Sequence, residues 1–129
     1  MLRILSFTKT GIELNEKLCK KLNNDSCAVY APKRILDRKE KLTYLPENIP
    51  EWIQEYWGVD DFLFIGAAGI AVRMIAPSVK DKYTDSAVLV MDKKAQHIIP
   101  LLSGHMGGAI PLAEQIADIT GAIPVITTA

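Results

Sequence analysis

The sequence has no charge imbalance, few cysteines and no long apolar run, and each shortage excludes a class of protein. Lys plus Arg and Asp plus Glu both number 15 in 129 residues, so the formal net charge is zero. A neutral chain has no global attraction for nucleic acid or an anionic membrane surface. The longest apolar stretch, residues 62–75, is interrupted by two glycines and an arginine, which argues against a membrane span.

The two cysteines, Cys19 and Cys27, form no C-x-x-C motif. We expect them to be buried free thiols, which suits a reducing compartment. Because the chain also begins directly with a strand-like run and shows no signal-peptide pattern, we expect a cytoplasmic protein without nucleic-acid or membrane partners. No Cys/His spacing resembles a zinc site, so we expect no metal bound by the protein itself.

Strand-like and helix-like segments alternate along the chain. Strands are predicted over residues 2–7, 26–30, 42–45, 62–65, 87–91, 97–101 and 123–128, and helices over 10–22, 50–57, 67–76 and 108–120. The spacing of Thr10 and Glu13 predicts a capping box at the first helix. The alternation predicts a three-layer α/β fold, Rossmann-like, with a mostly parallel open sheet and one antiparallel hairpin strand. Residues 1–129 are expected to form a single domain.

Two glycine-broken turns, residues 65–69 and 102–109, each follow a predicted strand and open a predicted helix. Such a turn leaves backbone N–H groups free at a helix N-terminus, where the partial positive charge favours anions. Ligands bind beyond the carboxyl ends of the strands in open α/β sheets, and we expect both turns to lie there, with the Thr8–Gly11 turn. For the first turn, Gly66–Gly69, the alternative is that small residues only allow close packing of strand against helix.

Three side chains near these turns have chemistry of their own. Arg73 is the only charge between Asp61 and Lys80, and it must reach water, a carboxylate or a ligand anion. His105 lies among glycines, where it could act as an acid or base, although capping of the next helix is an alternative role. For Ser103, binding an anion or capping a helix is the more ordinary role than nucleophilic attack.

Neither phosphate-binding fingerprint is complete in this chain. The G-x-x-G of the first turn is not the dinucleotide pattern, and no Gly-Lys-Ser/Thr follows it as a P-loop requires. A nucleotide-binding domain is therefore disfavoured. The polar segment Asp81–Asp85 before a predicted strand is either a binding loop or an ordinary solvated loop.

The stretch from Phe64 to Thr128 resembles the N-terminal part of the CbiG family, the cobalt-precorrin-5A hydrolases of anaerobic cobalamin biosynthesis. Four segments carry the resemblance, in order and at specific spacing: Ile65–Arg73, Asp81–Asp85, Pro100–Ala109 and Pro124–Ala129. The first sixty residues match more loosely.

The resemblance implies hydrolytic opening of the δ-lactone of a cobalt-bound tetrapyrrole, with release of acetaldehyde. Under it, His105 is the candidate general base, and amides of Gly107–Gly108 or Ala68–Gly69 are candidates for the oxyanion hole. Arg73 and Lys82 would hold carboxylates of this anionic substrate. The substrate-binding set is Gly66, Ala68, Gly69, Arg73, Lys82, Ser103, Gly104, Gly107 and Gly108. No protein cofactor is expected, because the substrate carries the cobalt.

Members of this family continue into a C-terminal region that this sequence lacks. We therefore expect residues 1–129 to be the N-terminal region of a longer architecture, with a site completed by that region or by a separate chain. The alternative function is a non-catalytic module that binds a tetrapyrrole or another anion. The sequence also leaves open whether the chain forms a homo-oligomer.

Overall fold

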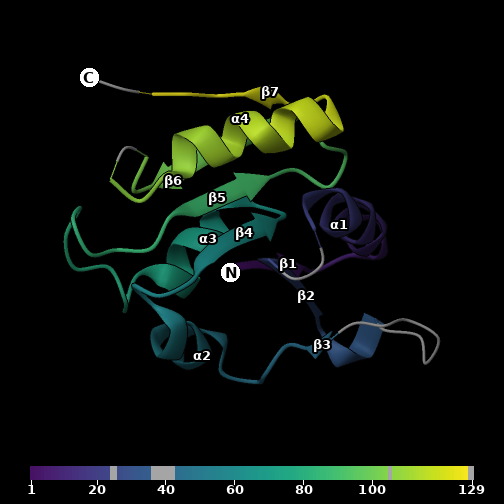
Figure 1. Ribbon diagram of the computed structural model, residues 1–129. Coiled ribbons are helices and arrows are strands. Elements are labelled where there is room, and N and C mark those ends of the chain that lie inside the picture. Colours follow the sequence, from purple (N-terminus) through teal and green to yellow (C-terminus); the bar gives the residue numbers. More distant parts are fainter. Residues whose placement is uncertain (24–25, 36–42, 105, 128–129) are drawn as a thin grey trace.

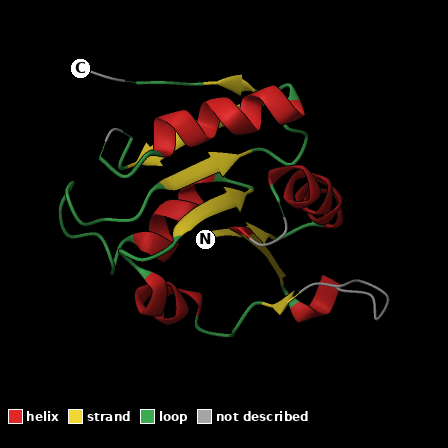
Figure 2. Ribbon diagram, viewed as in Figure 1, coloured by secondary structure: helices red, strands yellow, loops and turns green. Residues whose placement is uncertain are grey.

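Seven strands form one sheet in the order β3-β2-β1-β4-β5-β6-β7 in this computed structural model (Figures 1 and 2). The structure describes residues 1–23, 26–35, 43–104 and 106–127. The strands are β1 (Leu2–Ser6), β2 (Cys27–Ala31), β3 (Thr43–Tyr44), β4 (Asp61–Ile65), β5 (Val88–Met91), β6 (His97–Leu102) and β7 (Ile123–Pro124). The helices are α1 (Lys9–Leu22), η2 (Lys33–Ile35), α2 (Ile49–Tyr56), α3 (Ala68–Ile75) and α4 (Ala109–Thr120).

Strand direction divides the sheet into two parts. Strands β3, β2, β1, β4 and β5 are parallel neighbours, whereas β6 pairs antiparallel with β5 and β7 pairs parallel with β6. The predicted α/β fold and its hairpin are therefore confirmed. We call the edge where β1, β4 and β5 end the carboxyl edge, and the edge where they begin the amino edge.

The helices cover the sheet in two layers, which completes a three-layer fold. Residues of α1 and α4 share one apolar cluster with the sheet, and residues of α2 and α3 share a second cluster on the opposite face. Figure 1 shows α4 in front of the sheet and α3 behind it. Strands β4 and β5 are buried on both faces, as the continuous apolar run over residues 62–65 predicts.

Local details correct two of the sequence predictions. The N-cap of α1 is Thr8, whose Oγ1 accepts a hydrogen bond from the Gly11 amide at 3.0 Å, and not Thr10. Strand β7 is only two residues long, because its ladder with β6 covers only Ile123 and Pro124. Both cysteines are free and buried, as predicted, and burial raises the pKa of the Cys27 thiol.

No helix in the described part of the chain combines the length and the apolar character that crossing a membrane requires.

Candidate functional site

The two glycine turns lie at opposite edges of the sheet, which corrects the prediction that they share one edge. The first turn follows β4 at the carboxyl edge, where Ile65 pairs with Met91. The second turn follows β6, whose last residue, Leu102, lies beside Val88 at the start of β5. The physical reason is the hairpin, since it reverses β6. The five residues of β4 separate the edges by about 16 Å.

At the carboxyl edge, α3 begins without a side-chain cap. Its N-cap is Ala67, and no partner for the amides of Ala68 and Gly69 is found among the described residues. Both residues are exposed, and a Cβ built on Gly69 would meet nothing within 4 Å. The Gly66 amide, in contrast, donates to the Met91 carbonyl at 2.9 Å. This turn therefore keeps two free donors at a helix start.

At the amino edge, the second turn uses the two amides of Gly107 and Ala109 within itself. The amides of Gly107 and Ala109 both donate to the Ser103 carbonyl at 3.2 Å, and the Ile110 amide donates to the Gly104 carbonyl at 3.1 Å. Gly108, with φ of 83°, is the N-cap of α4. The predicted oxyanion hole at Gly107–Gly108 consequently lacks the Gly107 donor, because that amide is already used.

Glycine at position 107 is required by packing. A Cβ there would lie 2.5 Å from the Ser103 Cβ and 3.0 Å from the Ser103 carbonyl oxygen, closer than any side chain tolerates. At Gly104, a Cβ would press on the Ile110 side chain at 3.1 Å. Close packing therefore explains Gly104 and Gly107, whereas at Gly69 in the first turn, for which the sequence suggested close packing, a Cβ would meet nothing within 4 Å.

Asp85 joins three segments of the amino edge. Its buried carboxylate accepts hydrogen bonds from the Trp57 indole at 2.9 Å and from the Lys80 amide at 2.9 and 3.1 Å. Its carbonyl accepts a hydrogen bond from the Ser103 hydroxyl at 3.0 Å. The loop that carries Lys82 is thereby fixed to the loop that carries His105. This hydrogen bond is neither of the roles that the sequence favoured for Ser103, anion binding or helix capping, and α4 has no side-chain cap among the described residues.

The outer part of the same loop presents exposed side chains. Asp81 accepts hydrogen bonds from the Thr84 hydroxyl and the amides of Tyr83 and Thr84, which folds the loop on itself. These bonds, the one from Thr84 above all, lower the pKa of the Asp81 carboxyl. The Tyr83 ring is 67% exposed, and the Lys82 ammonium lies 5.2 Å from its centroid.

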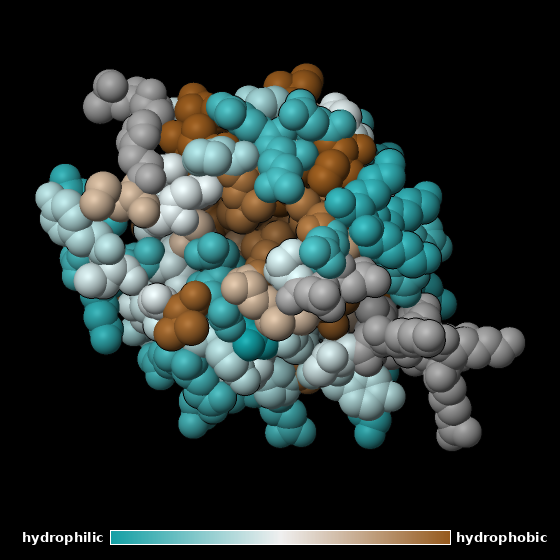
Figure 3. Space-filling model, in the orientation of Figure 1, coloured by the Kyte–Doolittle hydropathy of each residue, from teal (hydrophilic) through white to brown (hydrophobic). Residues whose placement is uncertain are grey.

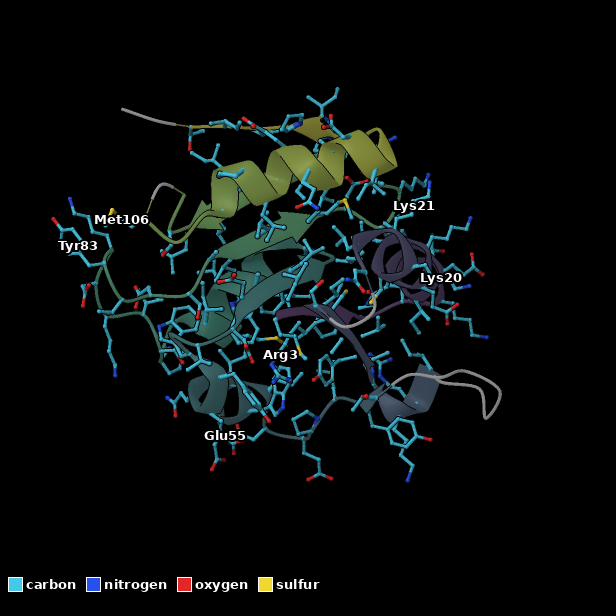
Figure 4. The ribbon with its side chains drawn as sticks, viewed as in Figure 1. Arg3, Lys20, Lys21, Glu55, Tyr83 and Met106 are labelled. Atoms are coloured by element: carbon cyan, nitrogen blue, oxygen red, sulfur yellow. The ribbon has the colours of Figure 1, made fainter. Side chains whose placement is uncertain are left out.

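Met106, in the second glycine turn, is 64% exposed. Figure 4 shows Tyr83 and Met106 at the same end of the molecule, which the joined loops occupy. The sequence reasoning did not include these two residues in the site. Large apolar side chains inside otherwise polar or glycine-rich loops were the signal that could have found them.

Arg73 lies in the last turn of α3 and is exposed. Among the described residues it has no hydrogen bond or ion pair, so an internal salt bridge does not explain it. A cation is favourable near a helix C-terminus, which gives Arg73 a structural role without a ligand. Since α3 runs from the carboxyl edge back toward the amino edge, Arg73 lies toward the amino edge, on the face of the sheet opposite α4.

Five of the predicted site residues lie in the two loops that meet at the amino edge: Lys82, Ser103, Gly104, Gly107 and Gly108. Arg73 lies on α3, which covers the face of the sheet opposite α4. Gly66, Ala68 and Gly69 lie at the other edge. His105, the predicted general base, lies outside the described residues. Among those that are described, no three His, Cys, Asp or Glu residues form a group that could hold a metal ion.

Asp61 is a second carboxylate at the amino edge with a shifted titration. Burial raises its pKa, and the hydrogen bond from the Ala87 amide to its Oδ1, at 3.0 Å, opposes that rise. The pKa values of Asp61 and Asp81 are therefore shifted in opposite directions.

Comparison with known proteins places the chain in a family. Residues 51–129 match the family described as Cobalamin synthesis G N-terminal. The cobalt-precorrin-5A hydrolase of Salmonella typhimurium is 60% identical over 67 residues, which cover 52% of this chain and 19% of that protein. The cobalt-precorrin-5A hydrolase of Priestia megaterium is 34% identical over 131 aligned residues, covering 98% of this chain and 34% of that protein.

A solved structure shows the same fold. The crystal structure of a cobalamin biosynthesis protein G homologue from Sulfolobus solfataricus matches with a TM-score of 0.73 and 26% identity. The match covers 98% of this chain and 36% of that one. The chain thus spans about a third of the length of the relatives that it matches over its whole length. Because the family match covers more than half of its residues, this chain belongs to the cobalamin synthesis G N-terminal family.

Proposed function

We propose that this chain supplies the N-terminal part of a cobalt-precorrin-5A hydrolase in cobalamin biosynthesis, and that it binds the tetrapyrrole at the amino edge. One observation carries the proposal: the Asp85 network fixes the Lys82 loop to the His105 loop. Described residues of two segments that resemble the family thereby lie side by side at the amino edge. Relatives of this chain bear the name of that hydrolase.

The exposed groups of this surface suit a flat, carboxylate-bearing macrocycle. Tyr83 and Met106 offer an aromatic ring and a thioether for stacking and apolar contact. Lys82 and Arg73 are cations without an ion-pair partner among the described residues, and they are available to carboxylates. The cobalt would arrive with the substrate, so the proposal needs no resident cofactor.

For the reaction, His105 is proposed to take a proton from the water that attacks the lactone carbonyl. The acyl C–O bond then breaks, giving a carboxylate and an alkoxide that takes the proton back from His105. Acetaldehyde leaves when the resulting hydroxyl loses its proton and the C–C bond between its carbon and the macrocycle breaks, with the electron pair of that bond passing to the macrocycle. The developing oxyanion needs donors. The Gly108 amide has no partner among the described residues, whereas the Gly107 amide does, so of this candidate pair only Gly108 can supply a donor. The relatives' additional polypeptide is proposed to complete the site.

Binding is tested by titrating the chain with cobalt-precorrin-5A under anaerobic conditions. Lys82→Gln/Tyr83→Ala is expected to weaken binding about tenfold, the loss of one stacking contact and one exposed ion pair. The matched control is Lys33→Gln/Tyr44→Ala, because the Lys33 ammonium lies 5.8 Å from the exposed Tyr44 ring elsewhere on the molecule. Equal losses in both variants would contradict the proposed surface.

Turnover is tested in the same mixtures by assaying acetaldehyde. His105→Ala is expected to abolish acetaldehyde release and to spare binding if His105 is the base. Unaltered release would reject that role. Binding without any acetaldehyde would contradict a catalytic function for the chain alone and would favour the non-catalytic tetrapyrrole-binding module.

A further inference from the structure

A groove of about 340 Å³ lies between α1 and α4, away from the residues proposed for the tetrapyrrole. Its lining is Leu14, Lys17, Leu18, Lys20, Lys21, Ile119 and Thr120. Figure 3 shows an apolar hollow on this face, bordered by hydrophilic side chains, where Figure 1 places α4 above and α1 to the right. The volume falls within the range of small-molecule sites, about 300–1,000 Å³.

The charges of the groove are all of one sign. Lys17, Lys20 and Lys21 are exposed, and no hydrogen bond or ion pair joins them to another described residue. Glu13 and Glu16 each precede one of these lysines by four residues, yet neither forms an ion pair with it. The three ammonium groups are therefore available to an anion.

The groove is also polar on one wall only. Its lysines all come from α1, and Lys17 and Lys21 are one helical turn apart, with Cβ atoms about 6 Å from each other. On the α4 wall, the Thr120 hydroxyl already donates to the Ile116 carbonyl at 2.8 Å and accepts from the Ala122 amide at 3.2 Å. Figure 4 shows Lys20 and Lys21 on α1, with Lys21 nearer the end of α4.

We propose that this groove binds a small amphipathic carboxylate, with its apolar body on Leu14, Leu18 and Ile119 and its carboxylate at the α1 lysines. The apolar floor would bury the hydrocarbon body of the ligand, and the lysines on the α1 wall would pair with its carboxylate. A carboxylate bears a single charge, so its desolvation beside an apolar floor costs less than that of a dianionic phosphate. The site is independent of the proposed hydrolase function.

Decanoate is the probe, with decanol and decylamine as ligands that keep the apolar chain and change the charge. Calorimetric titration of the intact chain is expected to show saturable binding of decanoate, weaker binding of decanol and none of decylamine. Chemical shifts of the Leu14 and Ile119 methyl groups should move during the titration. Decylamine binding as tightly as decanoate, or methyl shifts elsewhere only, would overturn the proposal.

Lys17→Gln/Lys21→Gln is expected to weaken decanoate binding about tenfold, because two exposed ion pairs to the carboxylate are lost together. Decanol binding should stay unchanged. The control variant, Lys93→Gln/Lys94→Gln, removes the same charge from an exposed turn after β5 and should leave decanoate binding unchanged. Equal weakening in both variants would overturn the proposal, as would sedimentation showing that a second copy of the chain fills the groove.

Discussion

The two glycine turns treat their backbone amides differently. At the carboxyl edge, the turn before α3 leaves the amides of Ala68 and Gly69 exposed and without a partner among the described residues. At the amino edge, the amides of Gly107 and Ala109 in the turn before α4 donate to the Ser103 carbonyl. A glycine-rich turn before a helix is thus not one kind of site. In the first turn the glycine is open to solvent, and in the second it lets the loop close on itself.

The amino edge compensates for its used amides with side chains. Its inner part is a buried network around Asp85, and its outer part exposes Lys82, Tyr83 and Met106. The carboxyl edge offers backbone donors at the switch point between β1 and β4, where ligands of open α/β sheets bind. The amino edge would therefore recognise a ligand through side chains, and the carboxyl edge would recognise one through backbone amides.

The largest effect is expected from alanine at the two contrasted glycines. Gly107→Ala should destabilise the fold by about 3 kcal/mol, because the new Cβ meets the Ser103 backbone and cannot move away. Gly69→Ala should gain about 0.5 kcal/mol, since its Cβ meets nothing and alanine favours the helix. Urea unfolding followed by circular dichroism measures both. Similar changes at both positions would show that the two turns do not differ as described.

Asp85→Ala tests the network that joins the two loops. We expect a loss of about 2 kcal/mol, because the Trp57 indole and the Lys80 amide lose a charged acceptor in a buried place. Trp57 fluorescence should change in the folded state as well. Asp81→Ala, in the exposed part of the same loop, is the control and should lose less. A control loss as large as that of Asp85→Ala would contradict the structural role of Asp85.

Ser103 allows a finer separation of hydrogen bonding from backbone strain. Its φ is 59°, a conformation that favours glycine, and its hydroxyl binds the Asp85 carbonyl. Ser103→Ala and Ser103→Gly both lose that bond, but only glycine relieves the backbone. The glycine variant should therefore be more stable than the alanine variant by about 1 kcal/mol. Equal stabilities in urea would show that strain at this position is negligible.

The smallest effects concern pH and have opposite signs at two aspartates. The raised pKa of Asp61 stabilises the fold at pH values below the pKa of an aspartate in the unfolded chain, about 4. That contribution is lost as pH rises through the pKa of Asp61 in the folded chain. The lowered pKa of Asp81 stabilises the fold above the unfolded value, and that contribution is lost as pH falls through the folded pKa.

Relative to the parent chain, Asp61→Asn should therefore gain stability as pH rises, and Asp81→Asn should lose it. Unfolding free energies measured in urea from about pH 3 to pH 6 give both slopes. Slopes of the same sign would contradict the assignment of one aspartate to a half-buried place and the other to an exposed turn.

The sequence predicted the fold well because its signals are local. The apolar run over residues 62–65 predicts a strand buried on both faces, and the turn after residue 91 predicts a hairpin. Both are found. The first helix is capped by Thr8 instead of Thr10, a shift of two residues that competing hydroxyls make hard to predict.

The site was harder to predict, because the position of a loop depends on strand direction. The sequence predicts the hairpin of β5 and β6. Because β6 runs antiparallel to β5, the turn after β6 lies at the opposite edge from the turn after β4, and that position depends on the whole sheet. The contact of Asp85 with Trp57, 28 residues earlier, has no local signal at all. Exposure of Tyr83 and Met106 likewise depends on tertiary packing, although their residue types hinted at it.

The most direct test of the account is to map amide chemical shifts of the chain during titration with cobalt-precorrin-5A. We expect the amide chemical shifts of Tyr83, Met106 and Gly108, at the amino edge, to change. Those of Ala68 and Gly69 should stay unchanged. Shifts confined to Ala68 and Gly69 would contradict it and would place the tetrapyrrole at the carboxyl edge.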